Sequence, residues 1–252
     1  MVSHKDWRSL RPPGVEKFKT REAFCGYIAK KMLAEVQYVQ ARGADFRVVL
    51  SGGKTPIDVN KSIQELAAAS AVDWSRVIIF FSDERCVPID SPDSNYGMIR
   101  KTLLEPLKIP ETKVFRFQVE NGPEEAASGY ERSIKGVFGE GAPPAFDLAI
   151  LGMGPDGHVA SLFPGRRSLQ EKKRYAVPGG KGPEGLERVT LTYPLLNQCK
   201  RVWFVMRGAE KQEALSRLID GPFNPEESPA QGICPVSGDL EYIIGDGLKY
   251  GR

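Results

Sequence analysis

An aspartate and a histidine stand two positions apart in residues 148–165, which read LAILGMGPDGHVASLFPG. Four apolar residues precede the glycine-rich turn that carries Asp156 and His158, as in a buried parallel strand with ionisable groups at its end. A carboxylate beside an imidazole fixes the tautomer of the ring and stabilises the imidazolium. The sequence has two histidines, and the other, His4, lies in the polar N-terminal stretch. We therefore predict that His158 is a general base that activates water; the alternative is a histidine that only satisfies backbone groups.

A second candidate is the turn SGGKTP, which begins at Ser51 and directly follows an apolar run. Gly52 and Gly53 permit positive φ angles and a close approach of a ligand to the backbone. Thr55 suits the N-cap of a helix and Pro56 its first position, where no N–H group is needed. The free N–H groups of such a helix start bind phosphate or carboxylate. The alternative is a plain loop between a strand and a helix.

Two more apolar runs, residues 76–81 and 201–206, end in charged residues. The charged residues are Asp83 and Arg85 after the first run, and Arg207 and Lys211 after the second. Because the carboxyl ends of parallel strands lie at one edge of a sheet, all four strand ends are expected to converge there. Together they offer an anion site, several cations, carboxylates and one imidazole. This set suits a small phosphorylated molecule with a second group that undergoes proton transfer.

One motif points to a different ligand. Gly152, Gly154 and Gly157 match the dinucleotide fingerprint G-x-G-x-x-G after a strand. That fingerprint requires a long helix directly after the turn. Pro155 removes an N–H group inside the turn, and Pro164 ends any helix after one or two turns. We therefore predict that the chain does not bind a dinucleotide.

Apolar strand runs alternate with helical patterns along the 252 residues, which predicts an α/β fold. We expect a Rossmann-like, mainly parallel sheet flanked by helices. Residues 16–252 are expected to form a single domain after a flexible N-terminal arm, residues 1–15. Helices are predicted over residues 22–42 and 123–138, strands over 113–117, 188–193 and 241–244, and a loop over 178–185.

The composition limits the partners. A net charge of +3 without interleaved aromatic residues gives little support to nucleic acid binding. No stretch approaches the roughly 18 apolar residues of a membrane span, and the N-terminus has no signal-like apolar region. The four cysteines are far apart in the sequence and form no metal-binding pattern, so neither a metal nor a cofactor is expected. We expect a cytoplasmic protein that binds a small molecule, as a monomer or alternatively as a homodimer.

Six segments, in chain order, carry a resemblance to a known family. They are SGGKTP at 51–56, DERCVP at 83–88, SNY at 94–96, GMGPDGHVASLFPG at 152–165, the RGAEK run ending at Lys211, and PAQG at 229–232. By these segments the chain resembles the 6-phosphogluconolactonases, within the larger group of sugar-phosphate lactonases and glucosamine-6-phosphate deaminases. The resemblance covers nearly the whole chain, and DGHVASLFPG is its most specific part.

The resemblance implies hydrolysis of 6-phospho-D-glucono-1,5-lactone to 6-phosphogluconate in the oxidative pentose phosphate pathway. It implies that His158 directs water onto the lactone carbonyl and that Asp156 orients the ring. The residues that it assigns to the phosphate and the sugar oxygens are Ser51, Gly52, Gly53, Thr55, Arg85, Arg207 and Lys211. Of these, Lys211 matches the family pattern more closely than Arg207. Asp83 is expected to bind sugar hydroxyls.

Two rival functions stay open. The deaminase branch shares the S-G-G turn and the D-G-H step, but an Asn-Glu-Pro follows its D-G-H and the Glu completes a catalytic relay. Residues 161–164 of this chain are Ser-Leu-Phe-Pro, without a carboxylate. The other rival is a non-catalytic sugar-phosphate sensor, which would not need the pair of Asp156 and His158. We expect the lactonase.

Overall fold

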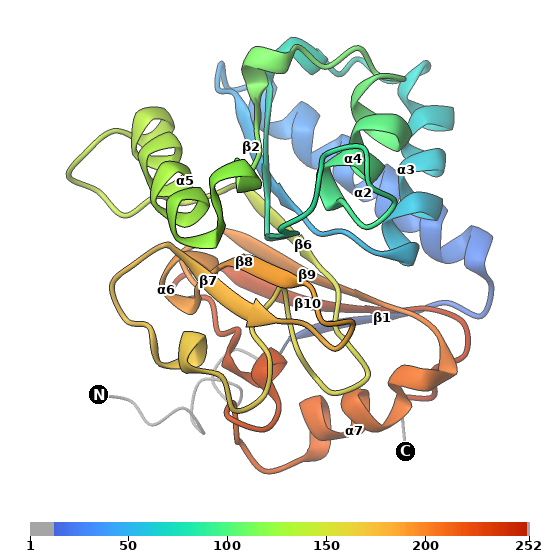
Figure 1. Cartoon of the computed structure of the whole chain (residues 1–252). Coiled ribbons are helices and arrows are strands. Elements are labelled where there is room, and N and C mark those ends of the chain that lie inside the picture. The colour runs from blue at the N-terminus through green and yellow to red at the C-terminus, as the bar shows by residue number, and fades with distance from the viewer. Residues whose placement is uncertain (1–12, 251–252) are drawn as a thin grey trace.

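Seven parallel strands form the main sheet of the chain, whose computed structural model describes residues 13–250. The strand order is β1-β10-β9-β6-β2-β3-β5, and every neighbouring pair is parallel (Figure 1). The strands are β1 (Gly14–Lys17), β2 (Phe46–Leu50), β3 (Val77–Phe81), β5 (Val114–Phe115), β6 (Leu148–Leu151), β9 (Arg201–Met206) and β10 (Asp239–Ile244). The predicted α/β class with a mainly parallel sheet is confirmed.

The apolar runs of the sequence form the middle of this sheet. β2, β3, β6 and β9 coincide with predicted strands, and all five side chains of β3 are buried. A parallel sheet has both faces covered, so its strands are apolar throughout instead of alternating with polar residues. The site residues predicted from the sequence therefore follow the most deeply buried part of the fold.

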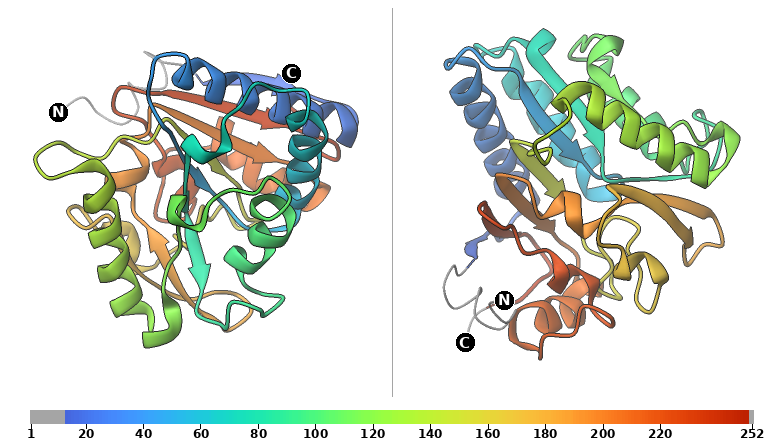
Figure 2. Two further views of the ribbon diagram at one scale, coloured as in Figure 1. Left: turned by 90° about the horizontal axis from the view of Figure 1, so that it is seen from above. Right: turned by 90° about the vertical axis from the view of Figure 1, so that its left-hand side faces the viewer.

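Helices cover both faces of the main sheet (Figure 2). Consecutive side chains of a strand point to opposite faces. Phe80 of β3 packs on Tyr130 of α5 (Pro123–Phe138), with ring centroids 5.6 Å apart, whereas Phe81 packs on Tyr96 of α4 (Asn95–Ile99) at 5.8 Å. On the α4 side, α2 and α3 pack against each other. The helices are α2 (Arg21–Gln40), α3 (Lys54–Ala67), α4 (Asn95–Ile99), α5 (Pro123–Phe138), α6 (Tyr193–Leu196) and α7 (Gln212–Asp220).

A second, antiparallel sheet of order β4-β8-β7 was not expected from the sequence. Its strands are β4 (Asp83–Arg85), β7 (Ala176–Lys181) and β8 (Glu187–Leu191). The loop prediction for residues 178–185 is therefore wrong up to Lys181. Pro178 and Gly180 are tolerated because the pairing shifts register between them, as in a β-bulge. Residues 83–85 were predicted only as the charged end of the strand before them, but they form β4 of this sheet.

The N-terminal prediction is corrected at its boundary. Residues 1–12 lie outside the described part of the chain, but β1 begins at Gly14, inside the predicted arm. β1 pairs with β10 and so extends the main sheet at one edge.

The predicted strand at 113–117 is shortened to two residues, Val114–Phe115. The predicted helix over 123–138 is confirmed with the same bounds.

Candidate active site

A cavity of about 300 Å³ lies where β2, β3, β6 and β9 end. The polar segments that follow parallel strands meet at the carboxyl edge of the sheet. The predicted site residues that line this cavity are Ser51, Gly52, Gly53, Thr55, Asp83, Arg85, His158 and Lys211. The structure therefore brings the four strand ends together.

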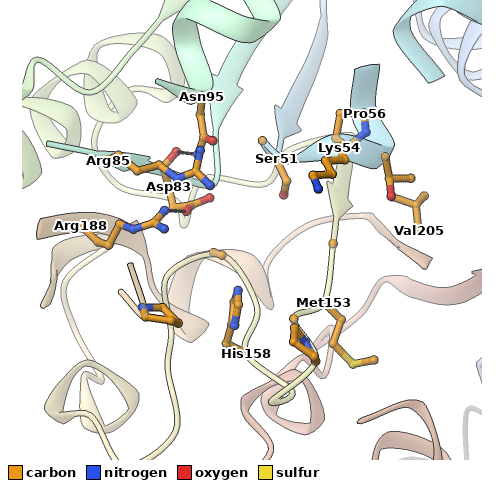
Figure 3. A pocket seen from close by; sticks show the side chains of 18 of the residues that line it. Ser51, Lys54, Pro56, Asp83, Arg85, Asn95, Met153, His158, Arg188 and Val205 are labelled. Carbon is orange, nitrogen blue, oxygen red and sulfur yellow. Dashed lines mark hydrogen bonds and ion pairs between the residues drawn. The ribbon is translucent and has the colours of Figure 1, made fainter. Parts of the chain in front are cut away.

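His158 stands between two groups of side chains in the close-up of the cavity (Figure 3). Asp83, Arg85 and Arg188 lie to one side of the imidazole, and Lys54 lies to the other. The cavity thus presents cations on both sides of the ring. This distribution suits an anionic ligand that extends across the imidazole.

Asp156 and His158 form a close pair. Nδ1 of His158 lies 2.6 Å from Oδ1 of Asp156, and the same oxygen accepts the backbone N–H of His158 at 3.1 Å. An ionised carboxylate only accepts hydrogen bonds, so Nδ1 carries the proton and Nε2 keeps its lone pair. Phe163 packs on the ring, with centroids 4.7 Å apart. The imidazole is therefore held in the tautomer that a general base requires.

The environment of the pair keeps Asp156 charged. Burial acts to raise the pKa of Asp156, but the hydrogen bonds and the charge of His158 outweigh it, so the pKa lies below its usual value. Gly154 makes this close packing possible. A Cβ atom at Gly154 would lie 2.2 Å from Nδ1 of His158 and 2.7 Å from Oδ1 of Asp156. Any side chain at this position would displace the pair.

The helix after β2 begins two residues earlier than predicted. The helix α3 begins at Lys54, with Gly53 as its N-cap at φ 107°, a conformation that glycine adopts readily. Thr55 is therefore not the N-cap, and Pro56 stands in the third helical position. Proline is tolerated there because the first turn has N–H groups without acceptors inside the helix. The start of α3 still faces the cavity, as an anion site requires.

Asp83 is the centre of a buried hydrogen-bond network. Its Oδ1 accepts the hydroxyl of Ser82 at 2.7 Å, and its Oδ2 accepts the hydroxyl of Ser161 at 2.7 Å. The guanidinium of Arg188 lies 3.7 Å from Oδ2. Asp83 is only 6% exposed, so these donors and this cation compensate for the burial of its charge.

Lys211 lines the cavity, but Arg207 does not. Burial lowers the pKa of Lys211, although neighbouring Glu210 acts to raise it. The guanidinium of Arg207 is 2.6 Å from Asp58 and 3.4 Å from Asp246. Arg207 therefore joins α3 to the segment after β10, and its predicted place among the substrate-binding residues is corrected. Its position directly after a strand suggested the cavity, but its side chain points to these two carboxylates.

Arg188 and Asn95 also line the cavity, and neither was predicted as a site residue. Arg188 enters from β8, with its side chain 7% exposed and ion-paired to Asp83 and Glu184. The antiparallel pairing of β8 with β4 brings it there, and no local pattern in the sequence indicates that pairing. Asn95 enters from the start of α4. The S-N-Y match at 94–96 was the available signal for it.

The segment after His158 turns and does not continue as a helix. Ala160, which lines the cavity, has a φ of 51°, a conformation that costs free energy in any residue with a side chain. Val159 and Leu162 form an isolated antiparallel bridge. Residues 152–166 contain no helix. The long helix of a dinucleotide-binding turn is thus missing from this segment, in agreement with the rejection of that motif.

Within residues 13–250, no helix combines the length and the apolar character needed to cross a membrane. The same part of the chain holds no group of three or more His, Cys, Asp or Glu side chains arranged to bind a metal ion.

Comparison with known proteins identifies the family. A family model described as glucosamine-6-phosphate isomerases/6-phosphogluconolactonase matches residues 19–242. The chain is 39% identical over 210 residues to a 6-phosphogluconolactonase of Homo sapiens, covering 81% of this chain and 79% of that protein. It is 38% identical over 200 residues to one of Synechocystis sp., covering 78% and 80%. The crystal structure of 6-phosphogluconolactonase from Thermotoga maritima matches with a TM-score of 0.80 at 31% identity, over 92% of this chain and 99% of that one. The chain belongs to the family of glucosamine-6-phosphate isomerases and 6-phosphogluconolactonases.

Proposed function

We propose that the chain hydrolyses 6-phospho-D-glucono-1,5-lactone to 6-phospho-D-gluconate. The observation that carries this proposal is the 2.6 Å contact between His158 and Asp156 beside a cavity with cations on both sides. The names of the relatives at 38% and 39% identity support the same substrate. A phosphorylated lactone needs a base for water and cations for its phosphate, and this cavity offers both.

In the proposed reaction, Nε2 of His158 accepts a proton from water as the water oxygen bonds to the lactone carbonyl carbon. Asp156 stabilises the imidazolium that forms. The bond between the carbonyl carbon and the ring oxygen then breaks, and the ring oxygen leaves as a hydroxyl group. The proton held by His158 is available to that oxygen, so the base is restored.

The cations of the cavity are proposed to bind the phosphate and the sugar oxygens. Lys54, Arg85, Arg188 and Lys211 line the cavity and are available for this task. The N–H groups at the start of α3 add a site for anionic oxygens. A cytoplasmic location and a monomeric or homodimeric state stay predictions from the sequence.

The experiment that tests this function measures acid release from freshly made 6-phosphogluconolactone. The purified chain should accelerate the release, and His158→Ala should lower the enzymatic rate by about 10²–10⁴-fold with an unchanged circular dichroism spectrum. His4→Ala, which replaces the other histidine, is the matched control and should keep full activity. Non-phosphorylated gluconolactone should be a much poorer substrate, because it lacks the anion that the cations bind.

Three results would contradict the proposal or part of it. Full activity of His158→Ala would remove the general base from the mechanism. Ammonia release from glucosamine 6-phosphate without lactone hydrolysis would favour a deaminase, although residues 161–164 carry no carboxylate. Binding of phosphosugars without turnover of either substrate would favour a sensor.

A further inference from the structure

We infer that Glu184 competes with the phosphate of a ligand for the guanidinium of Arg188. The carboxylate of Glu184 holds a cation of the cavity, and binding of a phosphate to that cation requires the release of Glu184. The inference rests on the proposed function, which brings a phosphorylated ligand into this cavity. It adds a residue that limits how tightly such a ligand binds.

Arg188 is held between two carboxylates. Its Nη1 lies 3.7 Å from Oδ2 of Asp83, and its Nη2 donates a hydrogen bond to Oε1 of Glu184. The contact with Asp83 is visible at the cavity in Figure 3. The guanidinium carries one positive charge, and the two carboxylates together carry two negative charges. Arg188 therefore attracts a further anion only weakly as long as both carboxylates stay beside it.

The two carboxylates differ in how firmly they are held. Asp83 is 6% exposed and accepts the hydroxyls of Ser82 and Ser161, each at 2.7 Å. The side chain of Glu184 is 39% exposed. Separation of Asp83 from Arg188 would leave a buried charge without its cation, whereas the carboxylate of Glu184 can turn into water. Glu184 is therefore the carboxylate that a ligand displaces.

Glu184 reaches Arg188 from the turn between β7 and β8. In this turn the N–H of Gly182 donates to the carbonyl of Leu186, and the N–H of Gly185 donates to the carbonyl of Gly182, both at 2.9 Å. A Cβ atom at Gly182 would lie 2.8 Å from both carboxylate oxygens of Glu184 and 2.9 Å from Nε of Arg188. The backbone of Gly182 thus covers one side of the ion pair. Both members of the pair also line the cavity, so a ligand there meets the carboxylate and the guanidinium together.

Phosphate and carboxylate bind a guanidinium through the same N–H groups, and they repel each other at short range. A half-exposed ion pair contributes little free energy, so a doubly ionised phosphate can break it. Breaking it still lowers the net affinity of the ligand. This loss applies to every phosphorylated ligand that reaches Arg188, the lactone and its product alike. Glu184 therefore weakens substrate binding and favours release of the product.

The test measures the binding of inorganic phosphate and of 6-phosphogluconate by titration calorimetry. Glu184→Gln keeps the size of the side chain and an amide oxygen for Arg188, but it removes the competing charge. Both ligands should bind Glu184→Gln about threefold or more tightly than the wild type. Glu187→Gln is the matched control, because it removes the same charge from the same hairpin at an exposed residue that does not line the cavity. Its affinities should equal those of the wild type.

A second background separates release from simple repulsion. Glu184→Gln is also made in a chain that carries Arg188→Gln, where no ion pair has to be broken. The gain in affinity should then shrink to less than about twofold, since the two residues act through their contact. An equal gain in both backgrounds would show that Glu184 only repels the ligand, and it would overturn the inference. If Arg188→Gln does not fold, Glu184→Gln and its control still give a result for or against it.

The inference and the proposed function fail in different ways. Unchanged or weaker binding of both ligands to Glu184→Gln would overturn the inference, even in a chain that hydrolyses the lactone. Weaker binding would mean that Glu184 positions Arg188 instead of competing for it. Tighter binding to Glu184→Gln without any lactone hydrolysis by the wild type would overturn the function alone. A wild type that binds neither ligand would contradict both.

Discussion

The tautomer of His158 depends on one carboxylate oxygen. Oδ1 of Asp156 accepts both the ring Nδ1–H and the backbone N–H of His158, so it holds the ring and the turn together. This geometry separates two contributions that Asp156 makes to the reaction. It orients the imidazole, and it supplies the negative charge that stabilises the imidazolium.

Asp156→Asn should test both contributions. The amide can donate its N–H to Nδ1, which would place the ring proton on Nε2 and remove the lone pair that accepts a proton from water. We expect kcat/KM for the lactone to fall by about 10²–10⁴-fold, with little change in KM. Asp220→Asn, at an exposed position at the end of α7, is the control. Equal activity of both variants would show that the contact has no catalytic consequence.

Lys211 gives a prediction about pH. Because burial lowers its pKa, Lys211 loses its charge at a lower pH than an ordinary lysine, whose pKa is about 10.4. If Lys211 binds phosphate, KM should begin to rise at a lower pH than the pH at which an ordinary lysine loses its proton. Lys211→Arg keeps its charge throughout this range, so its KM should stay flat. Identical profiles of KM against pH would exclude Lys211 as the titrating phosphate ligand.

At the scale of elements, one carboxylate joins β4 to α4. Oε1 of Glu84 accepts the backbone N–H groups of Arg85 and Asn95, both at 2.7 Å. Oε2 accepts the N–H of Tyr96 at 2.7 Å and the hydroxyl of Ser94 at 3.2 Å. Glu84 is 3% exposed. It therefore satisfies the first N–H groups of α4 and holds Asn95 in place against the cavity.

Glu84→Ala should destabilise the fold more than it disturbs the chemistry. It leaves buried N–H groups without an acceptor, and we expect the free energy of unfolding to fall by about 2–4 kcal/mol. The control is Glu105→Ala, which removes a carboxylate that is 62% exposed. It should change the free energy of unfolding by less than about 0.5 kcal/mol. Urea unfolding followed by circular dichroism measures both. A loss for Glu84→Ala no larger than that of the control would mean that water replaces the carboxylate.

The elements found from the sequence are those with a local pattern. Apolar runs identified β2, β3, β6 and β9, and proline followed by acidic residues identified the start of α5. β1 reads GVEK and β7 reads AVPGGK, and neither has the periodicity of a strand. Their pairing partners supply the stability that their own sequences do not indicate. The strand predicted over 188–193 corresponds to β8, but its pairing with β4 and β7, which brings Arg188 to the cavity, could not be predicted from local patterns.

At the scale of the whole molecule, two arginines near the carboxyl edge of the main sheet differ in what their side chains contact. Arg188 reaches the cavity from the small sheet, whereas Arg207, directly after β9, ion-pairs with Asp58 and Asp246. Both were close to predicted strand ends in the sequence, and only the structure separates them. The first lines the cavity, and the second joins distant segments of the chain.

Arg207→Ala and Arg188→Ala should therefore have different consequences. Arg207→Ala should lower the free energy of unfolding by about 1–3 kcal/mol and leave KM nearly unchanged, because it removes charged hydrogen bonds outside the cavity. Arg188→Ala should raise KM or lower kcat/KM for the lactone by about tenfold or more. Thermal unfolding and steady-state kinetics on both variants give the comparison. A large KM effect of Arg207→Ala would restore it to the substrate-binding residues.

The pairing of β1 with β10 has a consequence for biosynthesis. Gly14 pairs with Glu241 and Lys17 pairs with Ile244, so the earliest strand of the sheet has its partner in the latest one. While the chain emerges from the ribosome, β2, β3 and β6 can assemble and bury their apolar faces, but β1 must wait for β10. β10 in turn docks on β9, so this edge of the sheet closes only after β10 has been synthesised.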